Sequence, residues 1–204
     1  MEDGPVATLG TPGPPGRIKV LRLDHTGQPA AWLTWQQAAV LYSLGKVAWT
    51  AGEQTLRLHG GTNRVSGCQS VIEIHSIVAT RGRVRREARR RKVPPLSNRA
   101  LFLRDGHLCL YCGSEFSETM LTRDHVTPLS QGGRDCWSNV LTACRGCNTR
   151  KGGRTPEEAR MPLLAVPFVP NYAEYLVLSN RRILADQMAF LKARFRKGSR
   201  LLRA

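Results

Sequence analysis

The spacing of apolar and polar residues near the start of the chain predicts a small mixed unit over residues 18–80. The mainly apolar run over 18–23 is followed by turn residues at 24–27, which is typical of a strand. Thr34 and Gln37 have the spacing of a capping box, so they predict a helix that Gly45 ends. Further short strands are predicted over 47–50, 55–59 and 71–78. We therefore expect an α+β unit that ends near residue 80.

The C-terminal part of the chain has a helical pattern. Residues 161–180 form a connection interrupted by prolines, and Ala173 to Phe195 is predicted to be one helix. Its apolar face carries Leu184, Met188, Leu191 and Phe195, which should pack on the body of the protein. We expect residues 161–204 to form a connection followed by a basic amphipathic helix.

Composition divides the rest of the chain. Residues 1–17 are rich in glycine and proline and cannot bury a core, so we expect a disordered tail. Residues 81–95 are a basic linker, in which 81–92 carry eight positive charges and one negative charge. The remaining part, 96–160, is expected to be a second domain.

Basic residues outnumber acidic ones, 31 to 15, which gives a formal net charge of +16. Segments 81–92 and 181–204 together hold +14 of that charge. A polyanion such as nucleic acid is the partner that this charge favours. The two segments could also be simply solvated and flexible.

The N-terminus has neither the basic nor the apolar region of a secretory signal, and no apolar run is long enough to cross a bilayer. These features predict a cytoplasmic protein with no membrane contact. In a reducing compartment, cysteines indicate metal binding or core packing rather than disulfides.

Four of the six cysteines form two C-x-x-C pairs, Cys109/Cys112 and Cys144/Cys147. Matched pairs of this kind predict a tetrahedral Zn²⁺ site that is structural, because four thiolates leave no open position. Chance spacing or redox thiols are the alternatives. Cys68 is expected in the core and Cys136 in a loop.

The 31 residues between the two pairs carry a second pattern. They include Thr122-Arg123-Asp124-His125, then Trp137-Ser138-Asn139-Val140, and the second pair continues as Cys147-Asn148-Thr149-Arg150-Lys151-Gly152. Over about residues 97–156 the chain resembles the HNH endonucleases. The resemblance implies a zinc-stapled ββα-metal fold, in which one strand carries Asp124 and His125, a short strand follows Asn139, and a helix begins near Cys147.

The chemistry of phosphodiester hydrolysis suits these residues. Histidine titrates near neutral pH, so His125 is the candidate general base. Asp124 and Asn148 offer oxygen ligands for a catalytic Mg²⁺ or Mn²⁺. Neighbouring strand residues face opposite ways, so the strand must twist or end there if Asp124 and His125 are to serve one site.

Other residues have supporting roles. The resemblance implies that Asn139 braces the loop that orients His125. Arg123, Arg150 and Lys151 are candidate phosphate contacts, although basic residues in a last helical turn also suit the helix dipole. Family members usually have histidine where this chain has Asn148. Taken singly, an Asp-His pair on a strand is ordinarily solvated, and an asparagine near a helix start is ordinarily a cap.

The sequence therefore predicts a metal-dependent HNH endonuclease whose partner is DNA, most simply double-stranded. The alternative is a non-catalytic, zinc-stapled nucleic-acid-binding module in which arginine and lysine carry the function. In a third interpretation, residues 18–80 recognise DNA or a protein partner for a defence, phage or mobile-element nuclease. A homodimer is also compatible with a single site that cuts one strand at a time.

Overall fold

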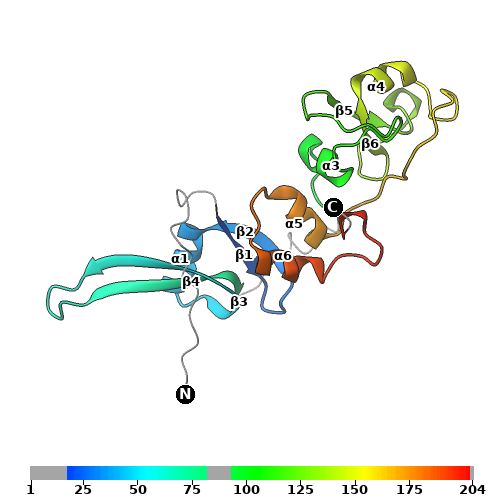
Figure 1. The fold of residues 1–204 in the computed structure, drawn as a ribbon. Helices are drawn as coiled ribbons and strands as arrows, with labels where there is room; N and C mark the ends of the chain where they lie inside the picture. The colour runs from blue at the N-terminus through cyan, green and yellow to red at the C-terminus, as the bar shows by residue number, and fades with distance from the viewer. Residues whose placement is uncertain (1–17, 82–92, 203–204) are drawn as a thin grey trace. The chain divides into compact units, whose positions relative to one another are not determined.

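The computed structural model describes residues 18–81 and 93–202 (Figure 1). Helices and strands are both present, which confirms the α+β class. Two compact units are formed from segments that are not contiguous in sequence. The first contains 18–81 together with Asn180–Arg194, and the second contains 93–179 together with 195–202. The predicted tail, and most of the predicted basic linker, lie outside the described residues.

A four-stranded sheet forms the first unit, in the order β2-β1-β4-β3. Its strands are β1 (Lys19–Leu23), β2 (Pro29–Thr34), β3 (Val47–Thr62) and β4 (Gln69–Thr80). β1 is parallel to β4, whereas the β1–β2 and β3–β4 pairs are antiparallel. Helix α1 (Trp35–Ser43) contributes to a core cluster of Val20, Ala38, Ile74 and Val78.

The predicted capping box is present at the start of α1. The Thr34 hydroxyl accepts a hydrogen bond from the Gln37 amide at 3.3 Å, and the Thr34 amide donates to the Gln37 side chain at 2.9 Å. These two bonds satisfy backbone and side-chain groups at the helix start. At the other end, Gly45 follows the C-cap residue with φ +62°, a conformation that glycine adopts at little cost.

The two short strands predicted over 47–50 and 55–59 are instead parts of one 16-residue strand, β3. Its register against β4 shifts between Ala51 and Thr55, where Gly52 has φ +86°. A bulge of this kind interrupts the alternation of side chains but not the strand. β3 and β4 form a hairpin that extends beyond the other strands of its sheet (Figure 1). Cys68, expected in the core, is exposed near the turn of this hairpin.

The prediction of one helix over 173–195 is also wrong. The structure has α5 (Tyr172–Ser179) and α6 (Ala185–Lys192), which belong to different units. Leu178 is buried in the core of the second unit, whereas Leu191 is buried in the first. The predicted helix therefore breaks between residues 180 and 184, because the apolar residues on the two sides of the break pack on different cores.

In the second unit, the order of elements expected for ββα-metal is observed. β5 (Leu121–His125) pairs with β6 (Val140–Cys144) in antiparallel fashion, and α4 (Arg145–Lys151) follows directly. α4 begins two residues earlier than predicted. Helix α3 (Asn98–Arg104) and α5 pack together beside this motif. Short 3₁₀ turns occur at Leu129–Gln131 and Arg200–Leu202.

A buried ion pair ties the second unit together. Arg104 and Asp105 have fully buried side chains, and the guanidinium donates twice to the carboxylate at 2.9 Å. Arg104 also donates to the carbonyls of Trp137, Val140 and Phe168. Asp105 in turn accepts the backbone amide of Thr142 at 2.9 Å. The pair satisfies its own charge and links α3 to β6.

No helix in the described ranges combines the length and apolar character that a bilayer crossing needs.

Candidate active site and metal centre

The four cysteines of the two pairs meet in one place. Their sulfur atoms all lie within 4.8 Å of one another. Cys144 ends β6 and caps α4, and its sulfur accepts the Cys147 amide at 3.4 Å. Cys109 and Cys112 lie in a tight turn in which the Gly113 amide donates to the Cys109 carbonyl at 2.9 Å. This cluster could hold a metal ion.

Electrostatics within the cluster favour a cation. Burial and the neighbouring thiols raise the pKa of Cys147, and burial raises the pKa of Cys109. Hydrogen bonding from the Ser114 backbone instead lowers the pKa of Cys112 to about 7. Buried thiolates repel each other and lose solvation, and a bound divalent ion removes both penalties. The donor set fits tetrahedral Zn²⁺.

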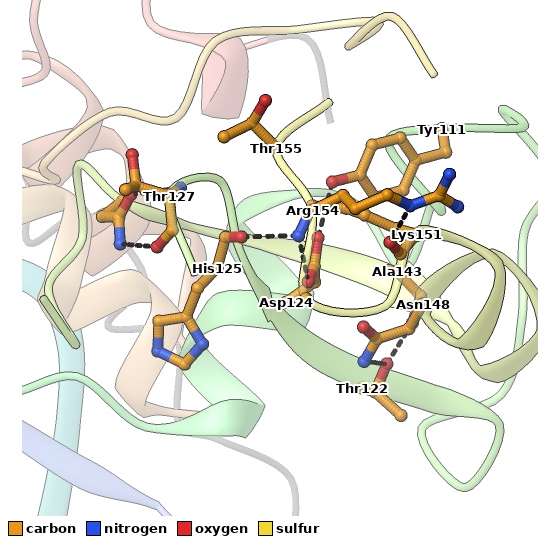
Figure 2. Close-up of polar contacts among 12 residues, drawn as sticks. Tyr111, Thr122, Asp124, His125, Thr127, Ala143, Asn148, Lys151, Arg154 and Thr155 are labelled. Carbon is orange, nitrogen blue, oxygen red and sulfur yellow. Dashed lines mark hydrogen bonds and ion pairs between the residues drawn. The ribbon is translucent and has the colours of Figure 1, made fainter. Parts of the chain in front are cut away.

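Asp124 faces α4 and is buried, with 5% of its surface exposed. The Tyr111 hydroxyl donates to one carboxylate oxygen at 2.5 Å, and the Lys151 ammonium donates to the other at 3.0 Å (Figure 2). Lys151, 1% exposed, also donates to the His125 carbonyl at 2.8 Å. Burial and the Asp124 carboxylate raise the pKa of Tyr111. Lys151 therefore neutralises Asp124 instead of extending into solvent.

His125 is the last residue of β5, and its ring is directed away from the Asp124 carboxylate (Figure 2). Its Nε2 lies 3.0 Å from Asp135 Oδ1. Arg123, which shares this strand face, donates to both Asp135 oxygens at 2.8 and 2.6 Å, and to Asn98 at 2.9 Å. Arg123, followed by His125, holds the pKa of Asp135 below its usual range. Asp135 thus links two residues of the predicted site.

Sequence reasoning missed Asp135. It lies ten residues after His125, in the loop between β5 and β6, and no ligand or catalytic spacing marks it. Its acidic side chain among Gly132, Gly133 and Arg134 was the one available signal. The loop that places it is defined by tertiary contacts, beginning with those of Asn139.

Asn139 has its side chain inside that loop. Its carbonyl oxygen accepts the Thr127 amide at 2.9 Å, and its NH₂ group donates to the carbonyls of Thr127 and Arg134 at 3.0 and 2.9 Å. Its own backbone carbonyl accepts the amide of Val126, the residue after His125, at 2.8 Å. An added Cβ at Gly133 would collide with the Thr127 carbonyl, so the loop also needs glycine there.

Asn148 projects from α4 toward β5 and donates to the Thr122 hydroxyl at 2.9 Å (Figure 2). Thr122 and Asp124 share one strand face, so Asn148 and Asp124 lie on the same side of β5. Within the described ranges no hydrogen bond joins these two side chains. Arg150, the third residue of interest on α4, is exposed, and its carbonyl accepts a hydrogen bond from Arg154 at 2.6 Å.

A family model described as HNH endonuclease matches residues 109–164, which contain both cysteine pairs, Asp124, His125, Asn139 and Asn148. This segment is similar to the HNH endonucleases, and residues 109–164 are called the HNH domain. The resemblance inferred from the sequence is therefore confirmed.

A search of curated proteins gives no match to the chain. Among solved structures, the chain is similar to the Type II-C Cas9 enzyme from Actinomyces naeslundii, with 21% identity and a TM-score of 0.29. That match covers 51% of this chain and 12% of the Cas9 chain. The present chain thus corresponds to a small fraction of that enzyme's length.

Proposed function

We propose that the HNH domain is a metal-dependent endonuclease that hydrolyses phosphodiester bonds of DNA. The observation that carries this proposal is the placement of His125 at the end of β5, with one ring nitrogen bonded to Asp135. The chain's net charge of +16 favours a nucleic-acid substrate. The proposal assigns a general base, His125, and a separate cation site, Asp124 with Asn148. The two can therefore be tested separately.

The contact with Asp135 supports one tautomer of the neutral His125 ring. An ionised carboxylate only accepts hydrogen bonds, so Nε2 carries the proton in this pair. Nδ1 then holds the free electron pair and can take a proton from water. That water oxygen forms a bond to phosphorus as the bond to the 3′-oxygen breaks, leaving a 5′-phosphate and, after proton transfer to the leaving oxygen, a 3′-hydroxyl. Asp135 acts as a positioning residue for the base.

Asp124 and Asn148 are the proposed ligands of a catalytic Mg²⁺ or Mn²⁺. A carboxylate has about four lone-pair sites, and Tyr111 and Lys151 occupy two on Asp124. Asn148 uses its NH₂ group on Thr122, so its carbonyl oxygen remains for a cation. Oxygen donors suit these hard ions, which neutralise charge on the phosphate and leaving oxygen when bound. Lys151 and Arg123 place further positive charge beside the two faces of β5.

Zn²⁺ is the ion that we propose for the four cysteines. Its role is structural, because four thiolates complete its tetrahedral coordination. The cluster joins the Cys109 turn to the junction of β6 and α4, which carries Asn148 and Lys151. Zinc thus maintains the helix that faces Asp124.

Nicking of supercoiled plasmid tests the proposal. Purified protein should nick DNA with Mg²⁺ or Mn²⁺ and not with EDTA, and His125→Ala should lower the rate by about 10²–10⁴-fold. His25→Ala, which removes an exposed histidine from the first unit, is the matched control and should keep the wild-type rate. Equal inactivity of wild type and His125→Ala, with DNA binding retained, would favour the non-catalytic binding module.

Asp135→Asn separates positioning from substrate binding in the same assay. The amide cannot enforce the Nε2–H tautomer, so the nicking rate should fall by about 10–100-fold. Affinity for DNA in EDTA should not fall, since a negative charge is lost and Arg123 is released. A parallel loss of rate and affinity would contradict the positioning role.

A further inference from the structure

A polar pocket lies in the unit that contains the HNH domain. The turn Arg196 to Arg200 forms one side, and Val166, Phe168 and Glu174 form the other. The cavity has a volume of about 250 Å³ and opens to solvent. None of these residues belongs to the cysteine cluster or contacts His125 in the described structure.

Ser199 lines this pocket and is 8% exposed. Its hydroxyl is buried and has no hydrogen-bond partner within the described residues. Buried hydroxyl groups are nearly always paired, because an unpaired one loses its bonds to water without compensation. Rotation of the Ser199 side chain toward the pocket would give this enclosed hydroxyl a partner in a ligand that accepts a hydrogen bond.

Arg200 is already fixed in place beside Ser199. Its guanidinium lies 4.8 Å from the centre of the Phe168 ring and donates to the Val166 carbonyl at 3.1 Å. Its nearest carboxylate oxygen, on Asp105, is 3.9 Å away and already accepts a hydrogen bond from Arg104. Burial lowers the pKa of Arg200. Its charge is therefore incompletely balanced, and several N–H donors remain for a ligand.

The other charges around the pocket are mainly positive. Arg196 and Lys197 are exposed, and their side chains make no hydrogen bond or ion pair with the described part of the chain. The Glu174 carboxylate would repel a bound anion. It is itself occupied by hydrogen bonds from the backbone amides of Asn171 at 2.6 Å and Arg196 at 3.4 Å. Three cations against one carboxylate leave the pocket with a net charge of +2.

We propose that this pocket binds a phosphate group, held by the Arg200 guanidinium and the Ser199 hydroxyl with Arg196 and Lys197 at its mouth. A planar guanidinium and a hydroxyl donor suit tetrahedral oxyanions. The phosphate can belong to the backbone of DNA or can be free inorganic phosphate. The site requires no nuclease chemistry, so it stands apart from the proposed function.

Backbone amide NMR of the full chain tests the proposal. Inorganic phosphate is titrated at constant ionic strength, and a short DNA duplex is titrated separately in EDTA. The amides of 196–200 should shift and saturate with phosphate. Ser199→Ala should raise the Kd for phosphate about tenfold, the equivalent of one hydrogen bond to a charged group. It should not lower thermal stability in phosphate-free buffer, because it removes an unpaired hydroxyl. Lys192→Gln, which removes an exposed charge from α6, is the control.

The two titrations distinguish the sources of the phosphate. If the duplex shifts the same amides and Ser199→Ala weakens DNA binding, the site holds the DNA backbone. If only inorganic phosphate acts, the site holds a free phosphate. Amides of 196–200 that shift with neither, or that respond equally in wild type and Ser199→Ala, would overturn the proposal.

Discussion

Two neighbouring residues of β5 have different surroundings, and these surroundings suit the different roles that we propose for them. Asp124 is buried against Lys151 and Tyr111, whereas His125 contacts Asp135 on the other strand face. Burial of Asp124 excludes water and strengthens its attraction for a cation such as Lys151. Partial exposure of His125 is compatible with the role of general base that we propose for it. The strand end keeps the two groups adjacent without placing them in contact.

Lys151→Met tests whether Asp124 can hold a divalent ion. The variant leaves a buried carboxylate without its cation, so the free energy of unfolding should fall by about 3 kcal/mol. Millimolar Mg²⁺ should restore part of this loss, since it provides a new partner for Asp124. Thermal unfolding with and without Mg²⁺ measures both effects. Arg150→Met removes an exposed charge from the same helix and should change stability little; a Lys151→Met variant indifferent to Mg²⁺ would argue against a cation at Asp124.

Local signals in the sequence predicted local features of this site well. Asp124 and His125 end a strand, and Asn139 precedes another, as expected. Burial of Lys151 was not predictable, because a basic residue in the last turn of a seven-residue helix ordinarily points to solvent. Its partner is 27 residues away in sequence. Asp135 was missed for the same reason, since only the folded loop brings it to His125.

At the scale of elements, α4 depends on a residue with two functions. Cys144 caps the helix through its sulfur and also belongs to the four-cysteine cluster. Cys144→Ser separates these functions, because serine is a good N-cap but a poor zinc ligand. We expect loss of bound zinc and a decrease of several kcal/mol in the free energy of unfolding of the HNH domain.

Metal analysis and thermal unfolding measure these changes. Cys136→Ser is the matched control, because Cys136 is a thiol outside the cluster, and it should keep both zinc and stability. Zinc retained by Cys144→Ser with unchanged unfolding would show that the cluster is not a structural zinc site.

Elements were predictable where their signals lie within a few residues. The capping box at Thr34 and Gln37 specifies the start of α1 by itself. By contrast, apolar spacing over 173–195 does not reveal which core each residue joins, so one helix was predicted where two exist, with the break at 180–184. The bulge near Gly52 likewise hides the continuity of β3, because it shifts the alternation on which strand prediction depends.

At the scale of the whole molecule, the chain forms most of the second unit and then returns to the first unit over Asn180–Arg194. α6 supplies Gln187, which is fully buried and donates to the carbonyls of Lys19 and Ser76 at 2.8 Å. These carbonyls lie near the start of the parallel β1–β4 pairing, at Leu21 and Ile77. The Gln187 side-chain amide therefore connects β1 and β4 just before the point where backbone hydrogen bonds between these two strands begin.

Gln187→Met should destabilise the first unit and leave the HNH domain intact. The substitution conserves much of the volume but leaves the buried Ser76 carbonyl and the partly buried Lys19 carbonyl without this donor, which costs about 2 kcal/mol. Gln36→Met makes the same chemical change at an exposed position of α1 and should be nearly neutral. Denaturant unfolding should show lower stability in the transition of the first unit only, with zinc content and nicking rate unchanged. If Gln187→Met also released zinc, the two units would unfold together, and the basic C-terminal segment would couple them energetically.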